Sequence, residues 1–487
     1  MPTPTPIPTP TPIPTPTPPI TDPAKLSVDS SALPGYVKGE RQNDRSYIKK
    51  LKDFGSFRWW NFAGNSTTPL EKYTATEQIA FGEPSTYTEV PGVLTFRGNH
   101  YRNAPSYGTA DVKEKKLEVV WTQAIGAISG TNSWWPGAGW TGQPLLVKWP
   151  AETRAVMGIK DEFKNDENFI EAIYPVFEGK IYFLDLASGK QSRDPIKVGY
   201  GFKGTATVDP RGYPLLYAGQ GLNDTNGKIG PFRYRIFDLI QNKEVSGWPG
   251  KDPVAFRSWG AFDSSSLVNW QTDTLLEPGE NGLFYKVKLN SKFDPAAKTV
   301  SVNPEFTKWR YRTPLTKTNG IESSQVIYRN LSYFSDNDGN LVCLDINKLE
   351  PVWAYNVGDD SDSTMTLEET ADGVFIYHGN TLDKRGSSGK KLCNLRKFNA
   401  LTGELVWQHD VPVVYESYLN AGLLASPLLG TGELEGMVIF NVCKTTSHAA
   451  GTMLALDTKT GKPIWTRTMT AYSWSSPLFI HSDDGNT

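Results

Sequence analysis

Asp336 and Asp338 are the first candidates for metal chemistry, because they lie in an oxygen-rich run that reads Asp-Asn-Asp-Gly-Asn. A calcium loop of the EF-hand type needs Gly at its sixth position and Glu at its twelfth. Counted from Asp336, those positions hold Leu341 and Asn347. Asp-Gly between two apolar runs is typical of a tight hairpin turn. We therefore expect a turn here, with a calcium site as the alternative. At the second acidic run, 359–362, we expect a solvated loop.

Histidine and cysteine show no spacing that indicates a metal or catalytic centre. The five histidines are scattered, without an HxH or HExxH pair. No Gly-x-Ser-x-Gly, Walker or dinucleotide-binding motif occurs. The three cysteines, Cys343, Cys393 and Cys443, are too few and too far apart for a disulfide framework. Their apolar neighbours indicate small buried side chains in strands. We assign no catalytic residue.

A repeated unit in the second half of the chain predicts the elements that position any site. The unit consists of a strand, an Asp-x-x-Thr-Gly turn and a second strand that contains Trp. Its best copy is 453–465. In 395–407 and 341–353 as well, Trp follows the Asp or Asn of the turn by eight residues. The Asp or Asn side chain bonds following amides, and Gly takes the positive φ angle. Weaker copies lie at 182–190 and 235–248.

A Ser/Thr/Gly-rich segment, here called a lead-in segment, precedes each unit. Seven occur, and they begin at Thr141, Gly204, Asp263, Glu322, Ser363, Ala425 and Ser475. Four-stranded units at this period predict an all-β fold, a β-propeller of seven blades with eight as the alternative. The last blade is incomplete, because one strand follows Trp474. We expect 117–121 to complete it as the outermost strand. Two middle strands are then missing, so we expect a C-terminally truncated chain.

The Ser-Ser-Pro lead-in at 475–477 and the Asp-x-x-Thr-Gly-x-x-x-Trp unit resemble the pyrroloquinoline-quinone-like repeat. That family contains quinoprotein alcohol dehydrogenases and also cofactor-free propellers, such as the outer-membrane-assembly lipoprotein. In the cofactor-dependent members, the resemblance implies a calcium or lanthanide ion over the quinone, an Asp base and a stacked Trp. It often implies a disulfide between adjacent cysteines as well. Adjacent cysteines are absent here, so we expect a cofactor-free member, without quinone or calcium. Fold alone does not establish activity.

Charge and hydropathy exclude two functional classes. Lys and Arg total 50 and Asp and Glu total 52, a net charge of -2, which argues against a general nucleic-acid binder. Mean hydropathy is -0.42, and the sequence has no apolar run long enough for a membrane span.

The N-terminal part of the chain differs in composition from the repeats. Residues 1–20 alternate mostly Pro and Thr and predict an extended linker, with further modules beyond it. Residues 21–116 predict an irregular arm that packs on the propeller, which spans 117–487. The Pro-Thr segment resembles linkers of modular extracellular proteins from cellulose-degrading, Gram-positive bacteria. We therefore expect an extracellular or cell-surface location.

The loops that lead into the inner strands of a propeller converge on one face, and here they are rich in aromatic and polar residues. The predicted ligand-binding residues of this funnel are Trp134, Trp135, Trp140, Lys203, Trp259, Glu322, Glu416, Tyr418, Asn420, Tyr472 and Trp474. Aromatic rings stack on sugar rings, and they equally anchor a protein partner. The tryptophans could instead only fill the channel.

Three functions follow from this sequence. The first is a non-catalytic recognition module that binds a polysaccharide, a cell-wall glycan or an extracellular protein. The second is a surface-layer or filament component that self-assembles by strand addition at the open blade. The third is a degenerate quinoprotein dehydrogenase.

Overall fold

The structure is a computed structural model that describes residues 22–42, 45–48, 55–139, 142–383, 391–415 and 420–484. The predicted linker, 1–20, lies outside the described residues. So do Trp140, Glu416 and Tyr418. No described helix is long and apolar enough to cross a membrane.

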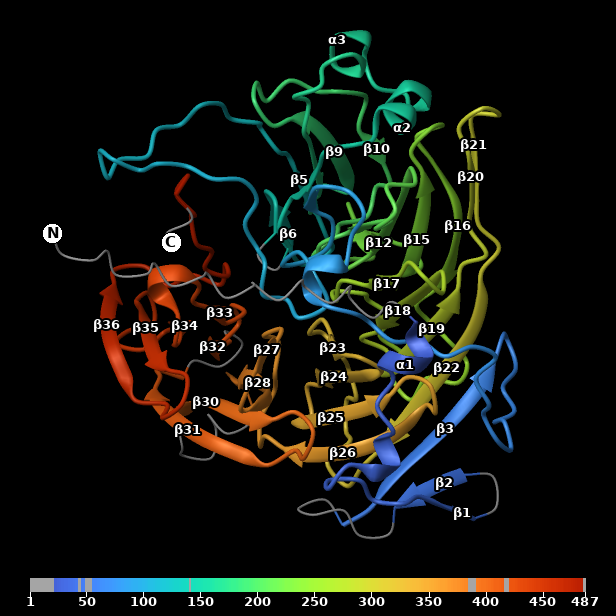
Figure 1. Cartoon of the computed structure of the whole chain (residues 1–487), viewed down its shortest axis with the longest axis vertical. Helices are drawn as coiled ribbons and strands as arrows, with labels where there is room; N and C mark the ends of the chain where they lie inside the picture. Colours follow the sequence, from blue (N-terminus) through green and yellow to red (C-terminus); the bar gives the residue numbers. More distant parts are fainter. Residues whose placement is uncertain are drawn as a thin grey trace, which may run out of the picture.

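Antiparallel sheets radiate from a central axis, so the protein is a β-propeller (Figure 1). Six sheets among the described residues have four or more strands, and each contains one blade. This confirms the predicted all-β propeller. The helices are short and lie in connecting segments: α1 (Pro23–Leu26), α2 (Ala151–Val156) and α3 (Asp161–Lys164).

The first three blades are given from their inner to their outer strand. Blade 1 consists of β7 (Leu145–Val147), β8 (Glu171–Pro175), β9 (Lys180–Asp185) and β10 (Ile196–Lys197). Blade 2 consists of β11 (Thr207–Val208), β12 (Leu215–Gly219), β15 (Arg233–Asp238) and β16 (Lys243–Pro249). Blade 3 consists of β17 (Leu267–Asn269), β18 (Thr274–Pro278), β19 (Leu283–Lys288) and β22 (Glu305–Arg312).

The next three blades have the same order. Blade 4 consists of β23 (Val326–Tyr328), β24 (Leu331–Ser335), β25 (Asn340–Asp345) and β26 (Glu350–Asn356). Blade 5 consists of β27 (Thr366–Thr370), β28 (Gly373–Gly379), β30 (Leu392–Asn399) and β31 (Leu405–Pro412). Blade 6 consists of β33 (Leu428–Leu429), β34 (Met437–Cys443), β35 (Gly451–Asp457) and β36 (Pro463–Met469).

The remaining strands join these sheets or form small hairpins. β4 (Gly92–Val93) pairs with β7, and β29 (Thr381–Leu382) and β32 (Ala421–Gly422) join the sheet of blade 6. The two-stranded hairpins are β5 (Ala127–Ser129) with β6 (Trp134–Pro136), β13 (Asp224–Thr225) with β14 (Lys228–Ile229), and β20 (Lys292–Asp294) with β21 (Thr299–Ser301).

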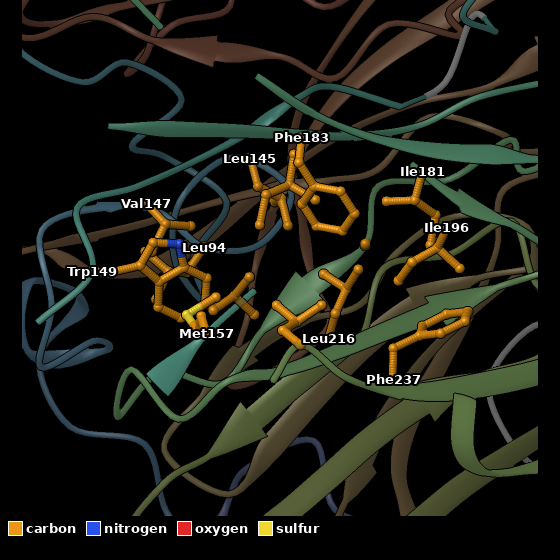
Figure 2. Close-up of a cluster of buried hydrophobic side chains, with 14 of the residues drawn as sticks. Leu94, Leu145, Val147, Trp149, Met157, Ile181, Phe183, Ile196, Leu216 and Phe237 are labelled. Carbon is orange, nitrogen blue, oxygen red and sulfur yellow. The ribbon is translucent and has the colours of Figure 1, made fainter. Parts of the chain in front are cut away.

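Apolar side chains of facing blades form the core. Between blades 1 and 2, Leu145, Ile173 and Phe183 pack against Leu216 and Phe237, all fully or almost fully buried (Figure 2). Cys343, Cys393 and Cys443 are buried in the strands β25, β30 and β34, as predicted.

The tryptophan of the repeat binds the turn of the next blade. Trp353 of blade 4 donates from Nε1 to the carbonyl of Ala400 in blade 5 at 2.9 Å. Trp407 of blade 5 donates to Thr458 in blade 6 at 3.0 Å. A Cβ atom on Gly461 would lie 2.6 Å from the Trp407 ring, and φ is +68° there. The turn glycine is therefore required both by its conformation and by the close approach of the indole.

The N-terminal arm contributes strands as well as irregular chain. β3 (Phe57–Ala63) pairs with β22 at the outer edge of blade 3, and β2 (Arg45–Ile48) and β1 (Glu40–Gln42) follow it. The sheet of blade 3 therefore has seven strands. Phe57 and Trp59 are buried on one face of β3, where Phe57 stacks on Tyr311.

Residues 91–104, here called the central segment, lie at the inner ends of the blades and bond to them in turn. The carbonyls of Pro91, Leu94, His100 and Tyr101 accept amides from the inner ends of blades 1, 2, 4 and 5. Arg102 donates to the carbonyls of Gln325 and Ser265, and Arg97 donates to those of Pro427 and Pro477. This segment thus ties blades 3, 4, 6 and the last lead-in segment together. Burial lowers the pKa of Arg97 to about 9 and of Arg102 to about 10.

The last blade is open. Its inner segment contacts the arm through a parallel bridge between Thr109 and His481. The prediction that residues 117–121 form the outermost strand is wrong, because these described residues form no strand. Trp121 nevertheless donates to the Leu186 carbonyl at 2.8 Å and covers Gly189 of blade 1. It therefore binds a blade turn as Trp353 and Trp407 do.

Candidate functional site

A small cavity lies on the propeller axis, where the lead-in segments meet. Its volume is ≈ 90 Å³. The described residues that line it are Phe96, Lys203, Asp263, Ser265, Glu322, Ser324, Asp362, Thr364, Asn420, Leu424, Ser426, Trp474 and Ser476. Phe96 belongs to the central segment, so this segment closes one side of the cavity.

The hydroxyls of the lead-in segments bind neighbouring blades to each other. The amide of Ser265 donates to Ser324 Oγ, and the amide of Ser324 donates to Thr364 Oγ1, each at 2.9 Å. The amide of Ser426 donates to Ser476 Oγ, also at 2.9 Å. The Ser and Thr residues that mark the repeats therefore link neighbouring lead-in segments by hydrogen bonds. These links hold the charged residues beside the lead-in segments near the axis.

Acidic side chains from several blades converge beside one lysine. Lys203 Nζ, before β11, lies 2.7 Å from Asp263 Oδ2, before β17. Oxygens of Asp263, Glu280 and Glu322 all lie within 4.8 Å of one another. Both Asp263 and Glu280 are buried. This axial cluster, Lys203 with Asp263, Glu280, Glu322 and Asp362, has more carboxylates than lysines.

Neighbouring side chains orient these carboxylates. Glu280 accepts a hydrogen bond from Trp259 Nε1 at 2.9 Å, and Arg257 lies 3.3 Å from its other oxygen. Asp362 accepts from Asn420 Nδ2 at 2.9 Å. By contrast, Asp263 Oδ1 is buried and has no hydrogen-bond partner among the described residues. A buried carboxylate oxygen of this kind favours a bound cation or donor.

Crowding and burial shift the pKa values of the axial cluster. Burial raises the pKa of Glu280 well above its usual value, and the charges of Glu322 and Asp263 raise it further. Desolvation, followed by the charges of Glu322 and Glu280, does the same for Asp362. Burial also raises the pKa of Asp263, although Lys203 opposes it. The pKa of Lys203 is raised: burial lowers it, but the surrounding carboxylates outweigh burial. A cation would relieve the repulsion among the acids.

The structure brings together part of the predicted funnel. Lys203, Glu322, Asn420 and Trp474 line the cavity. Around them, Trp259 holds Glu280, and the Tyr472 ring lies 5.7 Å from that of Trp474.

Two predicted tryptophans lie elsewhere. Trp134 is 67% exposed on β6, and Trp135 contacts Phe177 of blade 1. Neither is among the residues that line the cavity. Trp140, Glu416 and Tyr418 lie outside the described residues.

Three residues of the site were not predicted. Asp263 and Asp362 lie in or directly before a lead-in segment, a position that could have revealed them. Glu280 follows β18, and no sequence signal marks it. The prediction of a solvated loop at 359–362 is wrong, because Asp359 and Ser361 are almost fully buried and Asp362 lines the axial cavity.

Asp336 and Asp338 form the predicted turn. The carboxylate of Asp336 accepts from the amides of Asp338 and Asn340, and Gly339 has a φ of +87°. Asp338 Oδ2 accepts three amides from residues 317–319. The carboxylates of Asp336 and Asp338 therefore bind backbone donors. Among the residues that the structure describes, the acids close enough to share a cation are Asp263, Glu280 and Glu322.

The cavity does not fit the quinone that the family resemblance implies. Pockets for ligands of that size usually have volumes of about 300–1,000 Å³. The axial cavity has ≈ 90 Å³, and Phe96 closes it on one side. The cysteines lie in three different blades, so they offer no adjacent pair. The volume of the axial cavity and the carboxylate oxygens around it suit an ion with a few waters.

No protein-family model and no curated protein matches the sequence. Among solved structures, the chain is similar to a europium-containing methanol dehydrogenase, with 11% identity, a TM-score of 0.47, and coverage of 81% of this chain and 88% of that one. It is also similar to the quinohemoprotein alcohol dehydrogenase ADHIIG of Pseudomonas putida HK5, with 9% identity and a TM-score of 0.49. That match covers 80% of this chain and 74% of the other.

Proposed function

We propose that this protein is an extracellular, non-catalytic recognition module that binds a glycan through a divalent cation at the propeller axis. The observation that carries the proposal is the convergence of Asp263, Glu280 and Glu322 within 4.8 Å, with Asp263 Oδ1 buried and unpartnered among the described residues. Carboxylates of this kind are typical ligands of Ca²⁺.

The surroundings of the axial cluster support the glycan. A Ca²⁺ ion takes six to eight oxygen ligands, so three carboxylates leave positions open for water or for ligand hydroxyls. Trp474 lines the same cavity, and its indole offers an aromatic surface beside the ion. The extracellular location is supported by the Pro-Thr segment, in which Pro alternates mostly with Thr over residues 1–20.

Two binding measurements test this function. Calorimetric titration with Ca²⁺ is expected to give one site, and Asp263→Asn is expected to weaken it at least tenfold. Glu162→Gln, whose parent side chain lies on α3 and is 54% exposed, is the matched control and should bind Ca²⁺ like the wild type. Depletion of the protein by cellulose, xylan and isolated cell walls is then measured with Ca²⁺ and with a chelator.

Depletion of the protein by a matrix that depends on both Ca²⁺ and the Trp474 side chain supports the proposal. Unchanged Ca²⁺ binding in Asp263→Asn would overturn the ion site. Ca²⁺ binding without depletion of the protein by any matrix would overturn the proposed glycan binding. A dye-reduction assay with added pyrroloquinoline quinone and Ca²⁺ tests the dehydrogenase alternative, and turnover in it would overturn the non-catalytic assignment.

A further inference from the structure

Basic and aromatic side chains alternate on one face of the outer edge of blade 3, where β3 lies beside β22 (Figure 1). In an antiparallel pair, residues directly opposite each other share one face of the sheet. Arg312 of β22 pairs with Arg58 of β3, and Arg310 pairs with Trp60. The opposite face of β3 carries Phe57, which is buried in the core. The arginine face is therefore the outward-turned face of this strand pair.

Aromatic rings hold the guanidinium groups of the arginine face. The centre of the Phe256 ring lies 4.2 Å from Cζ of Arg310 and 4.7 Å from Cζ of Arg312. Cζ of Arg310 also lies 4.5 Å from the centre of the Trp60 ring, and Trp60 packs edge to face on Phe256. A guanidinium that stacks on a ring keeps its donors in the plane of the group, where they can bind an anion.

The inner end of the arginine face has a counter-ion from the protein, and the outer end has none. Lys308, opposite Phe62, is buried and lies 2.9 Å from Asp252 Oδ2. Arg58 and Arg312 form no ion pair with a carboxylate of the part of the chain that the structure describes. Like charges directly opposite each other destabilise a sheet. An anion bound between these two arginines would remove their repulsion.

The outer end of the arginine face is open to solvent. Phe256 is 40% exposed, Arg312 is exposed, and Arg58 and Trp60 are half-buried. The whole chain has a net charge of -2, so this accumulation of positive charge is local. A local field of this kind attracts anions. The exposed rings beside the arginines favour an anion that also has apolar surface.

Acidic sugars have both of these properties. Carboxylate and phosphate groups accept bidentate hydrogen bonds from a guanidinium. The apolar face of a sugar ring can pack on an aromatic ring, as Phe256 and Trp60 would require. A small free anion would use the arginines and leave the rings exposed.

We propose that the arginine face binds an anionic glycan, whose carboxylate or phosphate groups pair with Arg58 and Arg312 and whose sugar rings pack on Phe256 and Trp60. The choice of a glycan rests on the proposed function. The arginine face is nevertheless a separate site, because none of its residues lines the axial cavity. Binding at the arginine face therefore needs no Ca²⁺, and either site can fail without the other.

Calorimetric titration of the full chain in the presence of a chelator tests the proposal. The chelator prevents Ca²⁺ from linking the glycan to the protein. Hexagalacturonate is the probe with carboxylates, a glycerol-phosphate teichoic acid is the probe with phosphates, and neutral xylohexaose is the control ligand. We expect at least one anionic probe to bind at least about tenfold more tightly than xylohexaose. Affinity should fall as NaCl rises from about 0.1 M to about 1 M, because the Debye length shortens from about 10 Å to about 3 Å.

Variants locate the binding on the arginine face. Arg58→Gln/Arg312→Gln should weaken binding of the anionic probe at least about tenfold. Lys113→Gln/Lys190→Gln makes the same change in net charge at side chains that are 83% and 66% exposed, and it should bind normally. Arg312→Gln alone changes an exposed residue, so it serves as the test if the double variant does not fold.

Phe256→Ala distinguishes a glycan site from simple ion exchange. This variant keeps every charge and should still weaken binding severalfold, because it removes the ring on which the sugar packs. Ca²⁺ binding should be unchanged in Phe256→Ala and in the arginine variants, whereas Asp263→Asn should leave binding of the anionic probe unchanged in the chelator. These two results separate a failure of the arginine face from a failure of the axial site.

Four results would overturn the proposal. The first is absence of binding to both anionic probes, and the second is equal binding of xylohexaose. The third is an affinity that Phe256→Ala leaves unchanged, which would reduce the face to an ion exchanger. The fourth is tighter binding of single-stranded DNA or of phosphatidylglycerol vesicles that depends on Arg58 and Arg312, which would assign the face to another class of partner.

Discussion

Trp121 Nε1 donates a hydrogen bond of 2.8 Å to the carbonyl of Leu186, although 65 residues separate them in the chain. Trp353 and Trp407 make the same bond to Ala400 and Thr458. In each case the indole covers the glycine that closes the turn of the blade it contacts. One large side chain thus links each of these pairs of sheets, and the stability of the ring should depend on these contacts.

Gly461→Ala should destabilise the propeller for two reasons. The residue has a φ of +68°, and its Cβ would lie 2.6 Å from the Trp407 ring. The matched control is Gly436→Ala, where φ is +82° and nothing lies within 4 Å. We expect a loss of about 1–2 kcal/mol in the control, from backbone strain alone. Gly461→Ala should lose a further 1–3 kcal/mol, roughly, from overpacking. Urea unfolding measures both, and equal losses would contradict the role of the indole.

Trp407→Ala should cost more stability than Trp465→Ala. Trp407 is 8% exposed and bonds to the turn of blade 6, whereas Trp465 is only partly buried. Removal of a well-packed aromatic side chain costs about 3–5 kcal/mol, and we expect Trp465→Ala to cost less than half of that. The free energies of unfolding of the two variants provide the test. Similar losses would contradict the stabilising role of the bond from Trp407 to the turn of blade 6.

Arg102→Met should remove the junction of the central segment with blades 3 and 4. The guanidinium donates to Gln325, Ser265 and Phe96 carbonyls, and the substitution leaves these buried acceptors unpaired. We expect a loss of more than about 3 kcal/mol in the free energy of unfolding. Lys113→Met, whose parent side chain is 83% exposed, should change it by less than about 0.5 kcal/mol. Protease sensitivity of residues 91–104 is a second readout, and an unchanged digestion pattern would contradict the junction.

Asp362→Asn should stabilise the metal-free protein increasingly as the pH rises. Desolvation and the charges of Glu322 and Glu280 raise the pKa of Asp362 above its value in the unfolded chain. The folded state therefore keeps this proton to higher pH, and its contribution to stability falls as the pH rises toward the folded pKa. Asn keeps an acceptor for Asn420 and carries no charge. Urea unfolding at about pH 4.5 and about pH 7.5 should show the larger gain at the higher pH. Glu162→Gln is the control, and a gain that does not depend on pH would contradict the electrostatic explanation.

Sequence reasoning predicted the parts of the site that belong to the repeat. Lys203, Glu322 and Trp474 were found because each lies directly before or within a lead-in segment, and such segments converge in any propeller. Trp134 and Trp135 have similar spacing but form a short hairpin with β5 beside blade 1. Glu280 could not be predicted, because it follows β18 and reaches the axial cluster only through the packing of blade 3.

The sequence by itself determined the all-β propeller, the turns and the buried cysteines, since each follows from a local pattern. An Asp or Asn eight residues before Trp predicted the turns at Asn399 and Asp457, whose side chains accept the following amides. The tertiary structure alone decided that the central segment lies at the axis, that β3 extends blade 3, and that Asp263, Glu280 and Asp362 share one small cavity. Hydrogen-bonded turns depend on a few adjacent residues. The shape and charge of the axial cavity depend on the radial packing of blades that are far apart in the chain.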